Sequence, residues 1–157
     1  MTVSINIENV LTYLEKAVEK RGKDYVDERA AEDAGCVYVV RDIVKVEDPE
    51  EGEKEVLRET PGCIVGTALF LAGIPLKQIG QMDRAGDFYS AAQARVFLDD
   101  SERTESDVED YLPEDLEISV DAAEVLIVAQ REQDSGETWG WALSEATETR
   151  NKLLSEN

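Results

Sequence analysis

The sequence predicts an α+β fold: a mostly helical single domain over residues 1–157, with a small β-hairpin and a C-terminal antiparallel helical hairpin. Three observations predict it. Apolar residues recur at helical spacing in several segments, β-branched residues gather between 36 and 46, and two helical patterns near the C-terminus are joined by a short turn containing Gly136. A hydrophobic content of 42% in 157 residues is enough to build one core.

The first helix is predicted from an apolar stripe that ends before Gly22. Ser4 and Asn6 are the two candidates for its N-cap, because their side chains can accept a hydrogen bond from a free backbone N–H. The stripe, which we expect to face the core, consists of Ile7, Val10, Leu11, Leu14, Ala17 and Val18.

The β-hairpin is predicted from residues 36–46, which read as one long or interrupted strand. Pro49 and Gly52 mark the turn, and residues 54–58 form the returning strand. Because an isolated hairpin is marginally stable in water, we expect this one to pack on helices or to pair with another strand.

A central helix is predicted to begin at Thr60, as the cap, with Pro61 at its first position. Residues 64–72 are apolar nearly all round, so this helix should be buried. Gly73 ends it.

Four more helices complete the predicted fold. A short one spans 76–82 and another spans 88–98. Ser119 is the expected cap of the next helix and Thr138 the expected cap of the last. The apolar stripe of the last helix begins at Trp139, and the two final helices should pack antiparallel.

The charge of the protein is concentrated in one segment. The net charge is −20, and residues 99–121 supply half of it with eleven acids and one base. Pro113 interrupts any helix there, which predicts an acidic loop or irregular insertion over 99–117. Such a run repels nucleic acid and anionic membranes and attracts basic partners. The candidate partner-binding residues in it are Glu102, Glu105, Asp107, Glu109 and Asp110.

Two alternatives remain for the acidic run. Its carboxylates are spaced like the phosphates of a DNA strand if the segment is helical, which would allow it to imitate a nucleic acid. The other alternative is a solvated loop that keeps the protein in solution. The calcium-binding loop of an EF-hand is absent, because its spacing and glycine are missing.

The absence of histidine is the strongest chemical exclusion. It removes Ser-His-Asp and Cys-His catalysis and every His-ligated metal site. Cys36 and Cys63 do not make a disulfide framework, and we expect both to be buried reduced thiols. We therefore predict no enzyme, no cofactor and no metal. An enzyme that works through carboxylates remains a minor alternative.

Trp141 is a further candidate for partner binding. Residues two apart on a helix point in different directions, so Trp139 and Trp141 cannot share a face. Because Trp139 fits the apolar stripe, Trp141 is either an exposed interface anchor or packs against the preceding helix.

An alternative function rests on the predicted helix start at Thr60 and Gly62. Free N–H groups at a helix start can hold a phosphate, which would suit a protein that sequesters a small molecule or nucleotide. Such a site also needs cations that converge on it. The candidates are Arg41, Arg58, Lys77, Arg84 and Arg95.

Direct binding to DNA or to a membrane is not expected. Residues 69–79 are spaced like a helix-turn-helix around Gly73, but the second helix lacks a basic patch. The longest apolar stretch, residues 63–74, is too short to cross a bilayer. Residues 1–9 do not have the pattern of a signal peptide, so we expect a soluble intracellular protein.

Two stretches carry a resemblance to a known group. Residues 61–66 (Pro-Gly-Cys-Ile-Val-Gly) lead into an apolar helix, and residues 129–142 carry Gln130, Gln133 and the sequence Thr-Trp-Gly near the end of the chain. With the first helix and the first strand, these stretches resemble small acidic proteins from phages of actinobacteria. Residues 43–59 and the acidic run look like additions to that pattern. The resemblance implies an accessory phage protein in the bacterial cytoplasm, and no functional residue is carried over from it.

These observations favour a non-enzymatic protein that binds a host or phage protein with a basic surface, in takeover of the host or in anti-defence. The sequence allows a monomer or a homodimer. Because the acidic face repels itself, we expect any dimer to use the helical faces.

Overall fold

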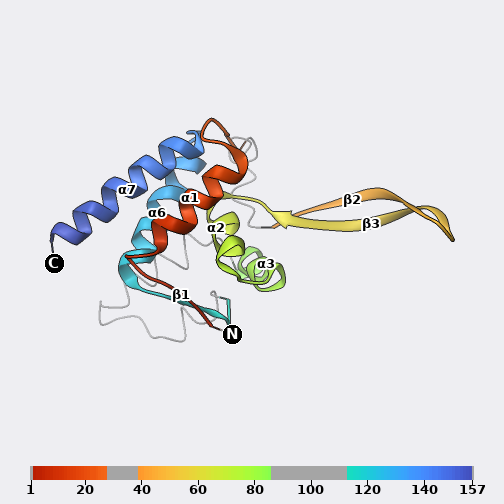
Figure 1. Cartoon of the computed structure of the whole chain (residues 1–157), viewed down its shortest axis with the longest axis horizontal. Coiled ribbons are helices and arrows are strands. Elements are labelled where there is room, and N and C mark those ends of the chain that lie inside the picture. The colour runs from red at the N-terminus through yellow and green to blue at the C-terminus, as the bar shows by residue number, and fades with distance from the viewer. Residues whose placement is uncertain (1, 28–38, 86–112, 157) are drawn as a thin grey trace.

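A computed structural model describes residues 2–27, 39–85 and 113–156 of the chain. These residues form five helices, one antiparallel hairpin and one short parallel strand pair (Figure 1). The predicted α+β class is therefore confirmed. The helix expected over 88–98 and the strand residues 36–38 lie outside the described residues.

The N-terminal segment forms strand β1 (Val3–Ile5) and helix α1 (Val10–Arg21). The N-cap position of α1 is occupied by Asn9, so the prediction of Ser4 or Asn6 was wrong. Asn6 makes the turn before the helix: its Oδ1 accepts the N–H of Glu8 at 2.9 Å and that of Asn9 at 3.1 Å. Ser4 lies in β1, which pairs in parallel with β4 (Leu116–Ile118). The predicted stripe of α1 is buried from Val10 to Val18, and Gly22 ends the helix with a positive φ of 97°.

Helix α2 (Ile64–Ala72) is the buried central helix, but it begins later than predicted. Thr60 and Pro61 do not start it, because they are the last residues of strand β3 (Gly52–Pro61), opposite Val40 and Val39. Pairing with β2 continues to the end of β3, so the chain cannot turn into a helix there. Cys63 takes the place of the cap, and its Sγ accepts the Gly66 N–H at 3.3 Å.

The remaining helices are α3 (Leu76–Ala85), α6 (Val120–Asp134) and α7 (Trp139–Ser155). Both predicted caps are confirmed: Ser119 Oγ accepts the Ala122 N–H and Thr138 Oγ1 accepts the Trp141 N–H, each at 3.1 Å. Helices α6 and α7 form the predicted antiparallel hairpin. Helix α1 contacts both α7 and α2, and α6 also packs on α2, so the apolar core lies between these four helices (Figure 1).

Trp139 joins the N-terminal segment to the helical hairpin. Its indole is fully buried and meets the ring of Tyr25 edge-on, with centroids 4.8 Å apart. The Arg21 guanidinium lies over both rings, at 5.0 Å from Tyr25 and 5.5 Å from Trp139. The next residue, Gly140, donates its N–H to the Lys23 carbonyl at 2.8 Å. A Cβ at this position would lie 2.7 Å from that oxygen, so the approach requires glycine.

The C-terminal end of the acidic run belongs to the fold. Asp115 exchanges two hydrogen bonds with Gln78 of α3, at 2.8 and 3.0 Å, and strand β4 begins at Leu116. The prediction of a loop or insertion as far as residue 117 was therefore wrong at this end, because buried Leu116 and Ile118 alternate with exposed Glu117 as in a half-buried strand. Residues 99–112 lie outside the described part.

Strands β2 (Val39–Asp48) and β3 (Gly52–Pro61) form a two-stranded ribbon that projects from the helical body (Figure 1). We call residues 39–61 the arm. The hairpin was predicted, but both strands are longer than expected. The expectation that the hairpin packs on helices is correct only at its base, where it contacts α2 and α3.

Candidate interaction surface

The arm is held closed by a turn that the sequence encodes. Asp48 Oδ1 accepts the N–H groups of Glu50 at 2.8 Å and Glu51 at 3.4 Å, and Gly52 has a positive φ of 78°. Aspartate before a turn and glycine in the left-handed region are the residue types that such turns require. The register that results pairs Asp48 with Gly52 and Val39 with Pro61.

The register places a central apolar pair on each face of the arm, because side chains alternate between faces along a strand. On the first face Ile43 lies opposite Leu57, and we call this the Ile43 face. On the second face Val44 lies opposite Val56. Charged pairs of opposite sign flank the centre of the Ile43 face, and the Arg41–Glu59 pair closes to 3.5 Å.

The apolar pair of the Ile43 face is open to solvent. Ile43 is 70% exposed and Leu57 is 56% exposed. Two large aliphatic side chains that meet on a projecting ribbon form a contiguous apolar contact surface, which is the kind of patch that marks an interaction site. This pair is the strongest candidate site in the described part of the chain.

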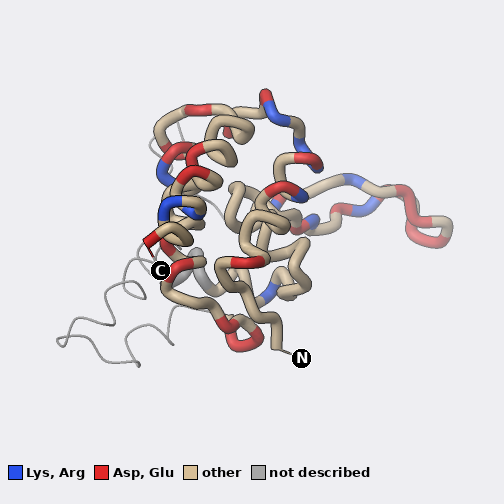
Figure 2. The backbone as a smooth tube through the Cα atoms, turned by 60° about the vertical axis from the view of Figure 1, so that its left-hand side comes forward, with Lys and Arg blue, Asp and Glu red and all other residues tan. Residues whose placement is uncertain are grey.

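The tip of the arm is acidic. Residues 47–53 contain five acids and no base, and Figure 2 shows them as a red loop at the end of the ribbon. Within the arm, Lys45 reaches Glu53 at 3.8 Å and Lys54 reaches Asp48 at 3.5 Å. These exposed ion pairs contribute little stability, but they leave most of the negative charge of the tip uncompensated.

The base of the arm is anchored in the body. Val39 is 1% exposed and Pro61 is buried. Arg21 Nη2, from α1, donates to the Pro61 carbonyl at 2.7 Å. Gly80 of α3 faces Arg41 so closely that a Cβ there would lie 2.6 Å from the Arg41 guanidinium. The arm is therefore fixed at one end and free at the other.

The turn of the arm should respond to pH. The N–H groups of Glu50 and Glu51, with a smaller contribution from Lys54, hold the pKa of Asp48 below its usual range. A carboxylate with a lowered pKa stabilises the folded turn at pH values above its usual pKa. This stabilisation is lost as the pH falls through the lowered pKa. In an NMR titration, the amide shifts of Glu50 and Glu51 should move with a midpoint below the usual range of aspartate. Asp48→Asn should abolish that transition. A midpoint at or above the usual range of aspartate would show that the Asp48 carboxylate does not accept the hydrogen bonds of the turn.

The residues that the sequence singled out for partner binding fall in two groups. Glu102, Glu105, Asp107, Glu109 and Asp110 lie outside the described residues. Trp141 is described: its indole is 48% exposed, and its Nε1 donates to Glu132 Oε2 of the preceding helix, α6, at 3.0 Å. Its role as an interface anchor stays a prediction.

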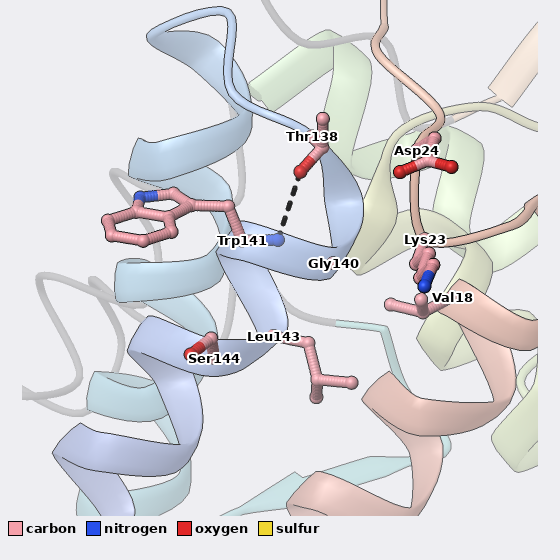
Figure 3. Close-up of a pocket in the computed structure, with 8 residues that line it drawn as sticks. All are labelled: Val18, Lys23, Asp24, Thr138, Gly140, Trp141, Leu143 and Ser144. Atoms are coloured by element: carbon pink, nitrogen blue, oxygen red, sulfur yellow. Dashed lines mark hydrogen bonds between the residues drawn. The ribbon is translucent and has the colours of Figure 1, made fainter.

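An open cleft of about 500 Å³ lies between the start of α7 and the end of α1 (Figure 3). Lys23 and Asp24 are its charged lining residues, and Thr138 and Ser144 bring hydroxyl groups. The ring of Trp141 points away from Lys23 and Asp24, so it does not close over the cleft. The cleft has no nucleophile paired with a base among these side chains, and it suggests no reaction.

The alternative ligand site at the start of α2 does not assemble from the described residues. Gly62 is buried, the Ile64 N–H donates to Gln133 Oε1 at 2.7 Å, and the Gly66 N–H is bound by Cys63. Arg41 and Arg58 lie on opposite faces of the arm, so they do not converge. Arg84 is part of α3, but its side chain is outside the described part, as is Arg95.

The described ranges contain neither a metal-binding cluster nor a helix suited to crossing a membrane. No group of three or more acidic or cysteine side chains there could hold a metal ion. None of the helices in residues 2–27, 39–85 and 113–156 combines the length and apolarity needed to cross a bilayer. Cys63 is buried with a free thiol, and Cys36 lies outside these ranges.

Sequence reasoning did not single out Ile43, Leu57 or the acids of the arm tip. The available signal was the local density of acids in 47–53, which is higher than in the longer run that follows. The exposure of Ile43 and Leu57 had no such signal, because the same aliphatic residues suit a buried strand equally well.

In comparisons with known proteins, no family model matches the chain, and no curated protein or solved structure matches it either.

Proposed function

We propose that this protein is a non-enzymatic binding protein that attaches to a basic surface of another protein through its arm. The observation that carries the proposal is the exposed Ile43–Leu57 pair on a ribbon that projects from the body. Protein interfaces gain most of their affinity from a few apolar anchors that become buried within a polar rim. On the arm, the anchor is the apolar pair and the rim is the surrounding charged side chains.

The charge of the arm favours a basic partner. The five acids of residues 47–53 lie beyond the apolar pair, at the free end of the ribbon (Figure 2). Opposite charge speeds association and selects the partner, whereas burial of the apolar pair slows dissociation. Under this proposal, the resemblance to phage proteins suggests a partner from the bacterial host or the phage, met in the bacterial cytoplasm during takeover or anti-defence.

A pull-down from a bacterial lysate tests the proposal with two arm variants. Ile43→Ser with Leu57→Ser removes the apolar anchor, and Glu50→Gln with Glu51→Gln reduces the acidity of the tip. We expect a partner that binds the unchanged protein at low salt, binds less at high salt, and is lost with the anchor variant. The tip variant should retain the partner with about tenfold lower affinity.

The control carries the same charge change on the body. Glu15→Gln with Glu19→Gln neutralises two exposed acids of α1, far along the chain from the arm. This control should bind the partner as the unchanged protein does. If the anchor variant and the control retain the partner equally, the arm is not the contact surface.

A further inference from the structure

The outer edge of β2 is suited to pairing with another strand. In the described part of the chain, the sheet of the arm contains β2 and β3 alone, so the outward-facing backbone groups of both strands have no strand beside them. Five of the ten β2 residues are aliphatic, and all five are the β-branched type that strands favour; β3 has two aliphatic residues, Val56 and Leu57. Strand β3 also begins with Gly52 and ends with Pro61, which weaken an edge for pairing. The open edge of β2 is therefore the better template.

The charges of β2 favour one register for pairing with itself. Two copies of β2 can pair antiparallel about a two-fold axis perpendicular to the sheet. Each residue then lies opposite a residue of the second copy whose side chain is on the same face of the joint sheet. In four of the possible registers, at least seven residues of β2 are paired. The two-fold axis of these registers passes through residue 42, 43, 44 or 45.

Three of these registers place side chains of like charge directly opposite each other. Centring on Asp42 sets two Asp42 carboxylates against each other, and centring on Lys45 does the same for two ammonium groups. Centring on Ile43 sets Arg41 against Lys45 of the second copy. Like charges directly opposite destabilise a strand pair.

The register centred on Val44 has no such conflict. It sets Val44 against Val44 of the second copy and pairs residues 40–48. Arg41 then meets Glu47 of the second copy, and the symmetry makes this opposite-charge pair twice. Each such pair stabilises an antiparallel ladder.

The antiparallel arrangement also limits repulsion between the acidic bodies. Each strand of the arm has ten residues, which span about 33 Å. Because the arms point in opposite directions, the two bodies lie at opposite ends of the joint sheet, several screening lengths apart at physiological salt. The net charge of −20 therefore does not oppose this dimer as it would oppose contact between the bodies.

We propose that the β2 edge is a self-association site, through which two copies of the chain form a four-stranded sheet in the order β3–β2–β2–β3, with Val44 on the two-fold axis. The partner is a second copy, and the contact is between strand edges. The faces that carry Ile43 and Leu57 stay open, so this inference stands or falls independently of the proposed function.

A charge reversal tests the register. Within one chain, Glu47 lies opposite Glu53, so Glu47→Lys relieves a repulsion and should not open the arm. In the dimer, however, the new lysine meets Arg41 of the second copy. We expect Glu47→Lys to raise the dimer dissociation constant about tenfold in sedimentation velocity, although it lowers the net negative charge. Glu53→Lys makes the same charge change on β3, and it should not weaken the dimer.

Cysteine cross-linking tests the symmetry in a Cys36→Ser background. Val44→Cys should form a disulfide-linked dimer under mild oxidation, since this position meets itself across the axis. Val46→Cys lies two residues from the axis, opposite Asp42 of the second copy, and should form no disulfide-linked dimer. A sedimentation coefficient that stays at the monomer value at every concentration would overturn the proposal. So would cross-linking through Val56→Cys on β3 in place of Val44→Cys.

Discussion

Replacement of Trp139 by alanine is expected to lower the free energy of unfolding by about 3–5 kcal/mol. The indole is fully buried, and it joins Tyr25 and Arg21 of the N-terminal segment to the start of α7. Its removal leaves a large cavity that the backbone contacts around Lys23 prevent from collapsing. Urea denaturation followed by circular dichroism measures the loss.

A milder substitution separates the ring from its polar atom. The Trp139 Nε1 is buried and has no hydrogen-bond partner in the described structure. Trp139→Phe keeps an aromatic ring against Tyr25 and removes this unsatisfied donor, so it should cost less than half as much as alanine. Equal losses for the two variants would show that packing of the ring against Tyr25 and Arg21 does not stabilise the fold.

Gln133→Leu is expected to cost about 1–3 kcal/mol, because it leaves a buried N–H without its partner. Gln133 Oε1 accepts the N–H of Ile64 at 2.7 Å and so links α6 to the first turn of α2. Leucine has a similar volume, so the loss reports hydrogen bonds and not a cavity. The variant also removes the hydrogen bond that Gln133 Nε2 donates to Asp134 Oδ1 at 3.2 Å. The midpoint and slope of urea denaturation give the value.

Gln130→Leu is the matched comparison, one turn earlier on the same helix. Gln130 is also fully buried, but its Oε1 has no partner, and only its Nε2 donates, to Asp134 at 3.0 Å. We expect this variant to lose less stability than Gln133→Leu. The reverse order would mean that the Gln133–Ile64 hydrogen bond does not anchor α2.

Much of the helical body could be predicted because its signals are local. Gly22, Ser119 and Thr138 end or cap helices through their own backbone or side chain, whatever lies around them. The start of α2 could not be predicted in the same way. Thr60 and Pro61 have the residue types of a helix start, but pairing with Val40 and Val39 holds them in a strand. That pairing depends on residues about twenty positions away.

The candidate site could be predicted only in part. The turn at Asp48 and Gly52 predicts a hairpin. Because the adjacent aliphatic residues Ile43 and Val44 point to opposite faces of a strand, the pattern does not indicate which face of the ribbon is covered, or whether either is. Among the described residues, no helix covers either face along the arm, because those that contact the ribbon reach only its base. The helical spacing predicted correctly that the two tryptophans do not share a face, since Trp139 is buried and Trp141 is 48% exposed.

Anchoring at one end gives the arm its capacity to bind. Arg21 lies over the rings of Tyr25 and Trp139, which meet edge-on, and also donates to the Pro61 carbonyl. The core and the base of the arm thus share one side chain, and the apolar pair beyond it is presented at a fixed position. A contact surface that is ordered before binding loses less conformational entropy when a partner binds.

Site-specific photo-crosslinking tests the arm as the contact surface most directly. A photoreactive phenylalanine analogue replaces Leu57 on the Ile43 face, and in a second protein it replaces Leu154, which is 41% exposed at the far end of α7. In a bacterial lysate, we predict a cross-link from position 57 to a basic protein, weakened by Glu50→Gln with Glu51→Gln and absent from position 154. Cross-links from position 154 alone, or equal cross-links from both positions, would contradict the account.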